Sequence, residues 1–256
     1  MQTYFEKLQE QKFLIIILIL LVTVNVVANF IGENVAILVG NFMYIPVAVS
    51  LVVVSTMKMF QSGFTGKHGM AWIALTVCAV SWLIAELTWI FYEVILNIDP
   101  FPSFADIFYL LGYPFLFMFL IFYIEPVQKA ITKKMIAVAT LLSLSILIPS
   151  LFIALQDNSN MSYFEAILAG AYPVVDALII IPALIGIALF FKGQVNFMWT
   201  LVCIGIFSLF VADTVFLFAQ LDMWYYTGHP IEVLFYFMYV LISYGVYDNM
   251  KVFSRA

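Results

Sequence analysis

The chain has 256 residues, of which 65% are hydrophobic and only 10% are charged, and its formal net charge is −5. A soluble domain needs about a quarter of its residues charged to keep its surface wet, so this composition excludes a water-soluble protein and makes lipid the solvent. A spanning helix needs about 20 apolar residues, which leaves room for spans and short connections but not for a soluble domain beside them.

Eight apolar runs follow one another along the chain, and each is long enough to cross a bilayer as a helix. We therefore predict an all-α, polytopic membrane protein that forms a single transmembrane domain over residues 1–256. The predicted spans cover residues 13–31, 35–57, 70–96, 106–124, 135–155, 163–191, 196–220 and 231–249.

The basic residues predict the orientation of these spans. All ten fall before the first span, after the last span or in every second connection, whereas the other connections carry acids such as Glu33, Asp99, Asp157 and Asp222. By the positive-inside rule, we expect both termini and the basic connections in the cytoplasm, with the protein in the cell (cytoplasmic) membrane. The basic residues are Lys7, Lys12, Lys58, Lys67, Lys129, Lys133, Lys134, Lys192, Lys251 and Arg255.

The two halves of the chain show a weak internal similarity. A shift of 127 residues aligns spans two and three with spans six and seven, and a shift of 126 aligns span four with span eight. We predict a duplicated four-helix unit, with repeat 1 at 13–124 and repeat 2 at 135–249, related by an axis near the membrane normal. The matched pairs include Pro46 with Pro173, Trp72 with Trp199, Glu86 with Asp213, Asp106 with Glu232, and Tyr113 with Tyr239.

Acidic residues inside the predicted spans indicate the candidate site, because an acid in hydrocarbon is costly and normally faces a protein interior. Glu86 and Asp213 fall in the outer halves of spans three and seven, and Asp176 falls halfway along span six. Helical spacing adds aromatic residues to the same faces. The candidate ligand-binding residues are Glu86, Asp213, Asp176, Trp82, Trp89, Glu93, Tyr113, Tyr172 and Tyr239.

These residues predict an acidic, aromatic cavity in the outer half, roofed by the connections at 97–104 and 221–230. Carboxylates beside aromatic faces suit a cationic or amine ligand, and they also suit a proton relay or a lipid headgroup. The alternative is that the acids are protonated and join helices as structural bonds. Asp106 and Glu232, at the outer starts of spans four and eight, are candidate capping or gating residues.

Other chemistries find little support in the sequence. Its histidines, His68 and His229, both lie in connections, and no lysine lies within a predicted span. We therefore expect no metal, haem, retinal or other cofactor, and no nucleic-acid partner. Cys78 and Cys203 lie in apolar runs and are expected to be free thiols. The lipid bilayer is the expected surrounding, with membrane or cytoplasmic proteins as further partners.

The run from Pro102 to Pro114, P-S-F-A-D-I-F-Y-L-L-G-Y-P, resembles the start of a helix in the membrane-embedded sensory region of some prokaryotic histidine kinases and diguanylate cyclases. That resemblance implies an eight-helix sensor over most of the chain. The sequence ends just after the eighth predicted span. We therefore expect signalling to use a partner protein.

A second resemblance is to the eight-span lysoplasmalogenase family, which has an acid after a small residue in spans three and seven. Glu86 and Asp213 follow Ala85 and Ala212 at those positions, and Pro46 matches a proline of that family. The sequence departs from the family pattern with glutamate rather than aspartate as the first acid, isoleucine before Pro46 in place of lysine, and a tyrosine at position 113 where histidine is expected.

Three functions follow as hypotheses. The leading one is a non-enzymatic membrane module that binds a small or lipidic ligand, cationic in character, and acts as a sensor or as a subunit of a larger complex. The second is a lipid hydrolase in which Glu86 and Asp213 act as acid and base. The third is a purely structural accessory subunit.

Overall fold

The computed structural model describes residues 2–156, 162–191 and 195–254, and within these ranges the chain forms helices and no β-strand. Eight helices are long and apolar enough to cross a membrane, which confirms the predicted all-α, multi-pass fold. They are α1 (Gln2–Ile31), α2 (Glu33–Ser62), α3 (Gly66–Ile90), α4 (Phe104–Ile124), α5 (Lys133–Gln156), α6 (Tyr163–Phe190), α7 (Asn196–Leu221) and α8 (Val233–Ser254). Three short helical segments adjoin them: η1 (Phe91–Ile95), η2 (Glu125–Ala130) and η3 (Pro230–Glu232).

Several helices extend beyond the predicted spans, because hydropathy detects only the apolar part of a helix that continues into polar surroundings. Helix α1 begins at Gln2 rather than at residue 13, and α2 ends at Ser62 rather than at residue 57. Lys58 therefore lies in α2 and not in a connection. Its side chain is buried and donates a hydrogen bond to Gln61 (3.2 Å). Of the residues used to predict orientation, Asp157, Lys192 and Arg255 lie outside the described residues.

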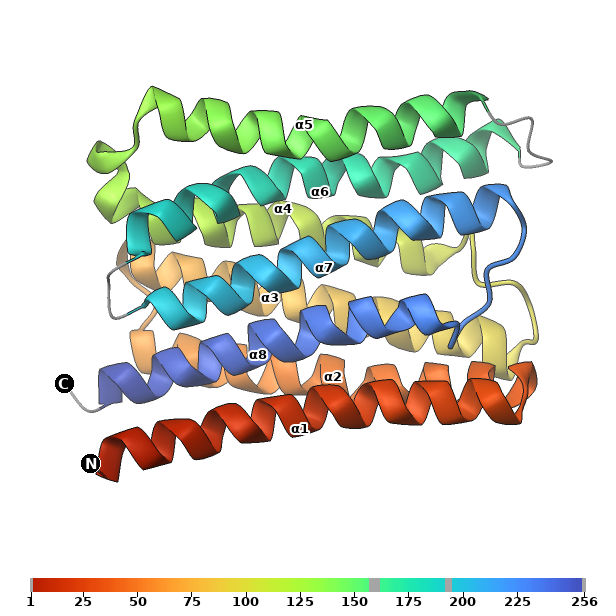
Figure 1. Ribbon diagram of the computed structural model, residues 1–256, viewed down its shortest axis with the longest axis horizontal. Coiled ribbons are helices and arrows are strands. Elements are labelled where there is room, and N and C mark those ends of the chain that lie inside the picture. The colour runs from red at the N-terminus through yellow and green to blue at the C-terminus, as the bar shows by residue number, and fades with distance from the viewer. Residues whose placement is uncertain (1, 157–161, 192–194, 255–256) are drawn as a thin grey trace.

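Six of the helices form a closed ring. In order around the ring, α2, α3, α4, α6, α7 and α8 each pack against the next, and α8 packs back on α2. Helix α1 packs outside the ring on α2 and α8, and α5 packs outside it on α6 and α7. Figure 1 shows α1 and α5 at opposite edges of the bundle, with both ends of the chain at the same end of the molecule. The ring encloses the space in which the candidate residues meet.

Two tryptophans bring neighbouring helices of the ring into close contact. The ring of Trp82 packs directly on Gly112 of α4, and its Nε1 donates to the carbonyl of Tyr109 (3.1 Å). The ring of Trp199 packs on Gly186 of α6, and its Nε1 donates to the carbonyl of Ala183 (2.9 Å). Small residues at helix interfaces allow such close approach in membrane proteins.

A Cβ at Gly112 or Gly186 would lie 2.2 Å or 2.0 Å from an indole atom, whereas one at Gly170 would meet its nearest neighbour at 3.9 Å. We expect Gly112→Ala and Gly186→Ala each to destabilise the protein by about 1–3 kcal/mol through overpacking. Gly170→Ala, also in α6, is the matched control and should leave stability unchanged or slightly raised. Thermal unfolding of the detergent-purified variants measures the difference. Equal effects of all three changes would contradict this packing.

Candidate ligand-binding site

A cavity lies inside the helix ring, toward the end of the bundle opposite the termini. Its volume, about 70 Å³ for the centres of water-sized molecules, is several times the roughly 10–15 Å³ that one water requires. The space therefore holds several waters or one small organic group. The predicted residues that line it are Trp82, Glu86, Trp89, Asp106, Tyr113, Tyr172, Asp213 and Tyr239.

Two acids on opposite sides of the ring each accept a hydrogen bond from a tyrosine. The hydroxyl of Tyr113, on α4, donates to Oδ2 of Asp213 on α7 (2.5 Å). The hydroxyl of Tyr239, on α8, donates to Oε1 of Glu86 on α3 (2.7 Å). Tyr109 also lies within hydrogen-bonding reach of Glu86. Both acids, Tyr113 and Tyr239 are buried and Tyr109 is partly buried, so the phenols replace water as donors to the carboxyl oxygens.

Two more acids, near the end of the ring opposite the termini, also accept hydrogen bonds from tyrosines. The hydroxyl of Tyr172, on α6, donates to Oδ1 of Asp106 at the start of α4 (2.5 Å). Glu232, which is fully buried at the start of α8, accepts from Tyr44 on α2 and from Tyr225 in the connection between α7 and α8. Burial and the neighbouring Glu232 raise the pKa of Tyr225 well above its ordinary value, so its hydroxyl keeps the proton that it donates.

Most of the polar hydrogens around the cavity are already used within the protein. The two indole N–H groups donate elsewhere, Trp82 to the backbone of α4 and Trp89 to Glu93 (3.2 Å) and Thr227 (3.0 Å). Five of the six lining tyrosine hydroxyls donate to carboxyl groups, and the sixth, that of Tyr109, lies near Glu86. Among the described residues, none of those that line the cavity is lysine, arginine or histidine. The cavity therefore presents carboxyl oxygens and aromatic rings to whatever enters it.

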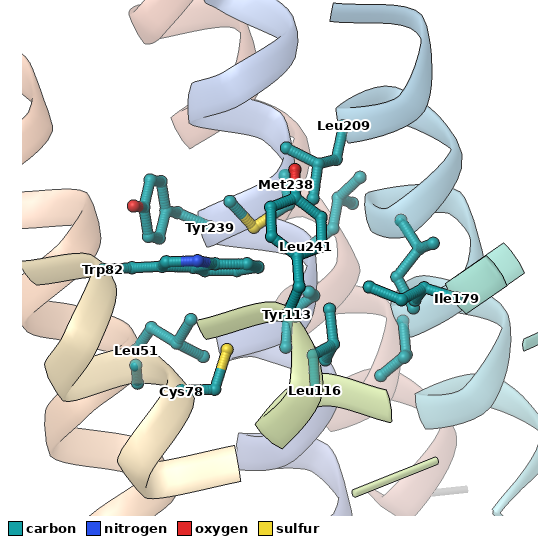
Figure 2. Close-up of a cluster of buried hydrophobic side chains, with 14 of the residues drawn as sticks. Leu51, Cys78, Trp82, Tyr113, Leu116, Ile179, Leu209, Met238, Tyr239 and Leu241 are labelled. Carbon is teal, nitrogen blue, oxygen red and sulfur yellow. The ribbon is translucent and has the colours of Figure 1, made fainter. Parts of the chain in front are cut away.

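The side of the cavity nearer the termini is closed by apolar packing. The ring of Trp82 makes edge contacts with Tyr113 and Tyr239, at centroid distances of 5.8 and 6.1 Å. Figure 2 shows Tyr239 on one side of this indole and Leu51 and Cys78 on the other. Leu51 and Cys78 are fully buried. A layer of packed apolar and aromatic side chains therefore separates the cavity from the end of the bundle that carries the termini.

The connection between α7 and α8 covers the opposite side. Its Tyr226 hydroxyl donates to Oδ1 of Asn29 (2.6 Å), and the carbonyl of Gly228 accepts from the side-chain amides of Asn25 (2.8 Å) and Asn29 (2.7 Å). Gly228 has φ +86°, and a Cβ there would lie 2.0 Å from the carbonyl oxygen of Ala36. Only glycine fits this contact. The cover is thus anchored to α1 and α2.

Two predicted ligand-binding residues do not line the cavity. Glu93 lies in the π-helical segment η1, one turn beyond Trp89, and it is not among the residues that line the cavity. Its Oε2 accepts from Asn41 (2.7 Å) and Trp89. Asp176 is fully buried behind the cavity wall, beside Asp213, and neither of its oxygens has a hydrogen-bond donor among the described residues.

The two predicted capping residues differ from each other. Asp106 caps α4 as expected, because its Oδ2 accepts from the backbone N–H of Ser103 (2.7 Å) and the Ser103 side chain accepts from the backbone of Ala105 (3.1 Å). Its other oxygen faces Tyr172 and the cavity. The Glu232 carboxyl instead accepts from two tyrosines, so its main role in the structure is to join α2 and the α7–α8 connection to α8.

Several cavity residues were missed by the sequence interpretation. Tyr44 and Tyr225 both line the cavity, but Tyr225 lies in a connection, where helical spacing gives no information. Tyr44 lies two residues before Pro46 and Tyr172 directly before Pro173, so the internal similarity does not align the two tyrosines. Tyr109 also lines the cavity and was not among the candidate ligand-binding residues, although it follows Asp106 by three residues in the same helix. The other lining residues are Leu209, Phe216, Phe235 and Met238.

The cross-ring bonds generate a prediction about stability. We expect Tyr113→Phe and Tyr239→Phe each to destabilise the protein by about 1.5–3 kcal/mol, the usual range for a hydrogen bond to a charged group. Tyr163→Phe is the matched control, because that side chain is 92% exposed. Chemical or thermal unfolding in detergent measures the loss. If the two ring variants are no less stable than the control, the phenol–carboxyl bonds do not hold the ring together.

Comparison with known proteins leaves the site to be understood from its own geometry. No protein-family model, curated protein or solved structure matches this chain. The chemistry of the cavity therefore carries the functional argument.

Proposed function

We propose that this membrane protein binds a small organic cation, or the cationic headgroup of a lipid, in the cavity inside its helix ring. The observation that carries the proposal is the chemistry of the cavity wall. Glu86, Asp106 and Asp213 line it, no basic side chain among the described residues does, and the indole N–H groups and most of the tyrosine O–H groups donate within the protein.

Such a wall discriminates between ligands by charge. An anion or a neutral acceptor would meet carboxyl oxygens and π faces, and both repel negative charge. An ammonium group would meet favourable partners in both, because aromatic rings attract a cation within about 6 Å of the ring centre, most strongly where water is excluded. Ionic attraction to Glu86 or Asp213 adds to this in the low-dielectric interior.

We further propose that the chain is a duplicated unit, with repeat 1 at 13–124 and repeat 2 at 135–249. The tyrosine–acid bonds support it, because they occur as exchanged pairs between the halves. Tyr113 of the first half donates to Asp213 of the second, and its counterpart Tyr239 donates to Glu86 of the first. The bonds from Tyr172 and Tyr44 cross between the halves in the same way. A two-fold axis through the cavity would produce this pattern.

A sensory role is the form of this proposal that the sequence resemblance favours. The run from Pro102 to Pro114, similar to the sensory regions of histidine kinases and diguanylate cyclases, supplies Asp106, Tyr109 and Tyr113 to the cavity. In this proposal the occupied cavity changes how the helices pack, and a membrane or cytoplasmic partner reads that change.

Ligand-induced stabilisation tests the binding proposal. We expect choline to raise the melting temperature of the purified protein, and its neutral isostere 3,3-dimethylbutan-1-ol not to, because the cavity selects charge. Glu86→Gln and Asp213→Asn should remove the choline effect. Glu33→Gln, an exposed acid at the same end of the bundle, is the matched control and should keep it. Short-chain phosphatidylcholine distinguishes a lipid headgroup from a free amine.

Other outcomes would replace the proposal. Equal stabilisation by choline and by its neutral isostere would show that charge plays no part. The lipid-hydrolase hypothesis uses the same two acids, so turnover of vinyl-ether lipids that either substitution abolishes would favour it instead. If Glu86→Gln and Asp213→Asn reduce stability and alter no ligand response, the acids are structural.

The orientation is also part of the proposal: both termini in the cytoplasm and the cavity toward the outside of the cell membrane. The support is the distribution of lysine and arginine. Cysteines introduced at exposed Glu33 and exposed Lys129 test it, because the native Cys78 and Cys203 are buried. A membrane-impermeant maleimide added to intact cells should label Glu33→Cys and not Lys129→Cys. The reverse pattern would invert the topology.

A further inference from the structure

Asp176 is a buried acid that the proposed binding site does not explain. It lies on α6 with no exposed surface, and both of its carboxyl oxygens lack a hydrogen-bond donor among the described residues. A buried carboxyl without a donor is strongly unfavourable, more so as an anion. A buried acid in a purely structural role normally accepts a hydrogen bond. Because Asp176 has no donor in the described part of the chain, we expect a proton between its carboxyl group and a neighbouring group.

Two groups lie within hydrogen-bonding reach of Asp176, the Tyr113 hydroxyl and the Asp213 carboxyl group, and the one hydrogen of the hydroxyl is already used. From α4, the Tyr113 hydroxyl already donates to Asp213. On α6 itself, one turn earlier, the Tyr172 hydroxyl donates to Asp106. From α5, Ser143 donates to the carbonyl of Ala177 (2.6 Å). The remaining neighbour is the carboxyl group of Asp213 on α7, which lies within hydrogen-bonding reach.

Two carboxyl groups can form a hydrogen bond only when one of them carries a proton. We propose that Asp176 and Asp213 bind a single proton between them, with Asp176 the protonated donor and Asp213 the acceptor. The proton gives Asp176 the bond that its burial requires, and it lowers the charge of the pair from two to one. Like charges in one buried site favour this arrangement.

The shared proton makes Asp176 a positioning residue. Tyr113 holds one oxygen of Asp213 on the α4 side, and Asp176 holds the carboxyl group from α6, so Asp213 is oriented between two donors. Asp213 lines the cavity and Asp176 does not. The remaining negative charge thus faces the cavity. This consequence rests on the proposed cation binding, whereas the shared proton itself does not.

The pair of neighbouring carboxyl groups, Asp176 and Asp213, occurs only in the second half of the chain. The residue that corresponds to Asp176 in the first half is Val49, and Glu86 has Tyr109 near it where Asp213 has Asp176. The corresponding residue to Tyr109 in the second half is Phe235. The two acids therefore have different neighbours. Glu86 lies beside two tyrosine hydroxyls, whereas Asp213 lies beside one tyrosine hydroxyl and a second carboxyl group. Only the second arrangement requires a bound proton.

Infrared spectroscopy of the purified full chain tests the shared proton without any ligand. Aspartate labelled with carbon-13 in its side-chain carboxyl should shift the carbonyl stretching band of a protonated acid, and Asp176→Asn should remove that band. If no protonated-acid band moves with the label, the proposal is wrong. It is equally wrong if Asp176→Asn removes a carboxylate band and leaves the acid band.

Asp106→Asn assigns the band without relying on the folding of the Asp176 variant. Asp106 is another buried, membrane-embedded aspartate near the cavity. If the labelled acid band persists in Asp106→Asn, it belongs to the Asp176–Asp213 pair. If the band disappears there, it belongs to Asp106, and the shared proton is excluded.

The positioning role has its own test, with choline as the probe. Asp176→Asn keeps a donor toward Asp213 and should bind choline as the unaltered protein does. Asp176→Leu keeps the size but removes the donor and should weaken binding roughly tenfold or more, the equivalent of one hydrogen bond to a charged group. Equal binding by both variants would exclude the positioning role. Failure of the unaltered chain to bind choline would refute the proposed function and leave the infrared result standing.

Discussion

The structure depends on one requirement: carboxyl groups inside a membrane must find donors within the protein, because lipid supplies none. Here most of the donors are tyrosine hydroxyls, and four of them reach an acid from the other half of the chain. The bonds from Tyr113 to Asp213 and from Tyr239 to Glu86 therefore connect helices that are distant in sequence. They join helices across the ring and at the same time line its interior, so the same contacts support the fold and form the site.

The use of phenols rather than basic residues decides what the cavity can hold. A lysine or arginine would neutralise an acid and leave nothing for a ligand to bind. A tyrosine donates one hydrogen without cancelling the charge of the acid, and it brings an aromatic ring to the wall of the cavity. Burial of Trp82 against Gly112 contributes a further ring at the base. The resulting space is small, closed by apolar residues toward the termini and covered by the α7–α8 connection, as expected for a binding site rather than an open pore.

Hydropathy and charge were sufficient to predict the eight helices, because a chain this apolar can satisfy its backbone in a membrane only as helices or as a closed barrel. The main acids were also predictable, since Glu86 and Asp213 interrupt apolar runs. The neighbours were harder to predict. Helical spacing identifies a face of one helix but not the helix opposite it, so the partner of each tyrosine could not be read from the sequence. Glu93 does adjoin Trp89, but spacing could not show that its carboxyl group accepts from Asn41 of α2 and does not line the cavity. Lys58 was misplaced because α2 extends beyond its apolar part.

The most direct test of the central claim is to locate a cation inside the ring. Arsenocholine carries arsenic in place of the choline nitrogen, so anomalous X-ray scattering from a crystal grown with it would mark the position of the charge. We expect a single strong peak within the cavity, between the carboxyl groups of Glu86 and Asp213 and against the ring of Trp82. An ordered cavity with the tyrosine–acid bonds intact and no anomalous peak would contradict the account.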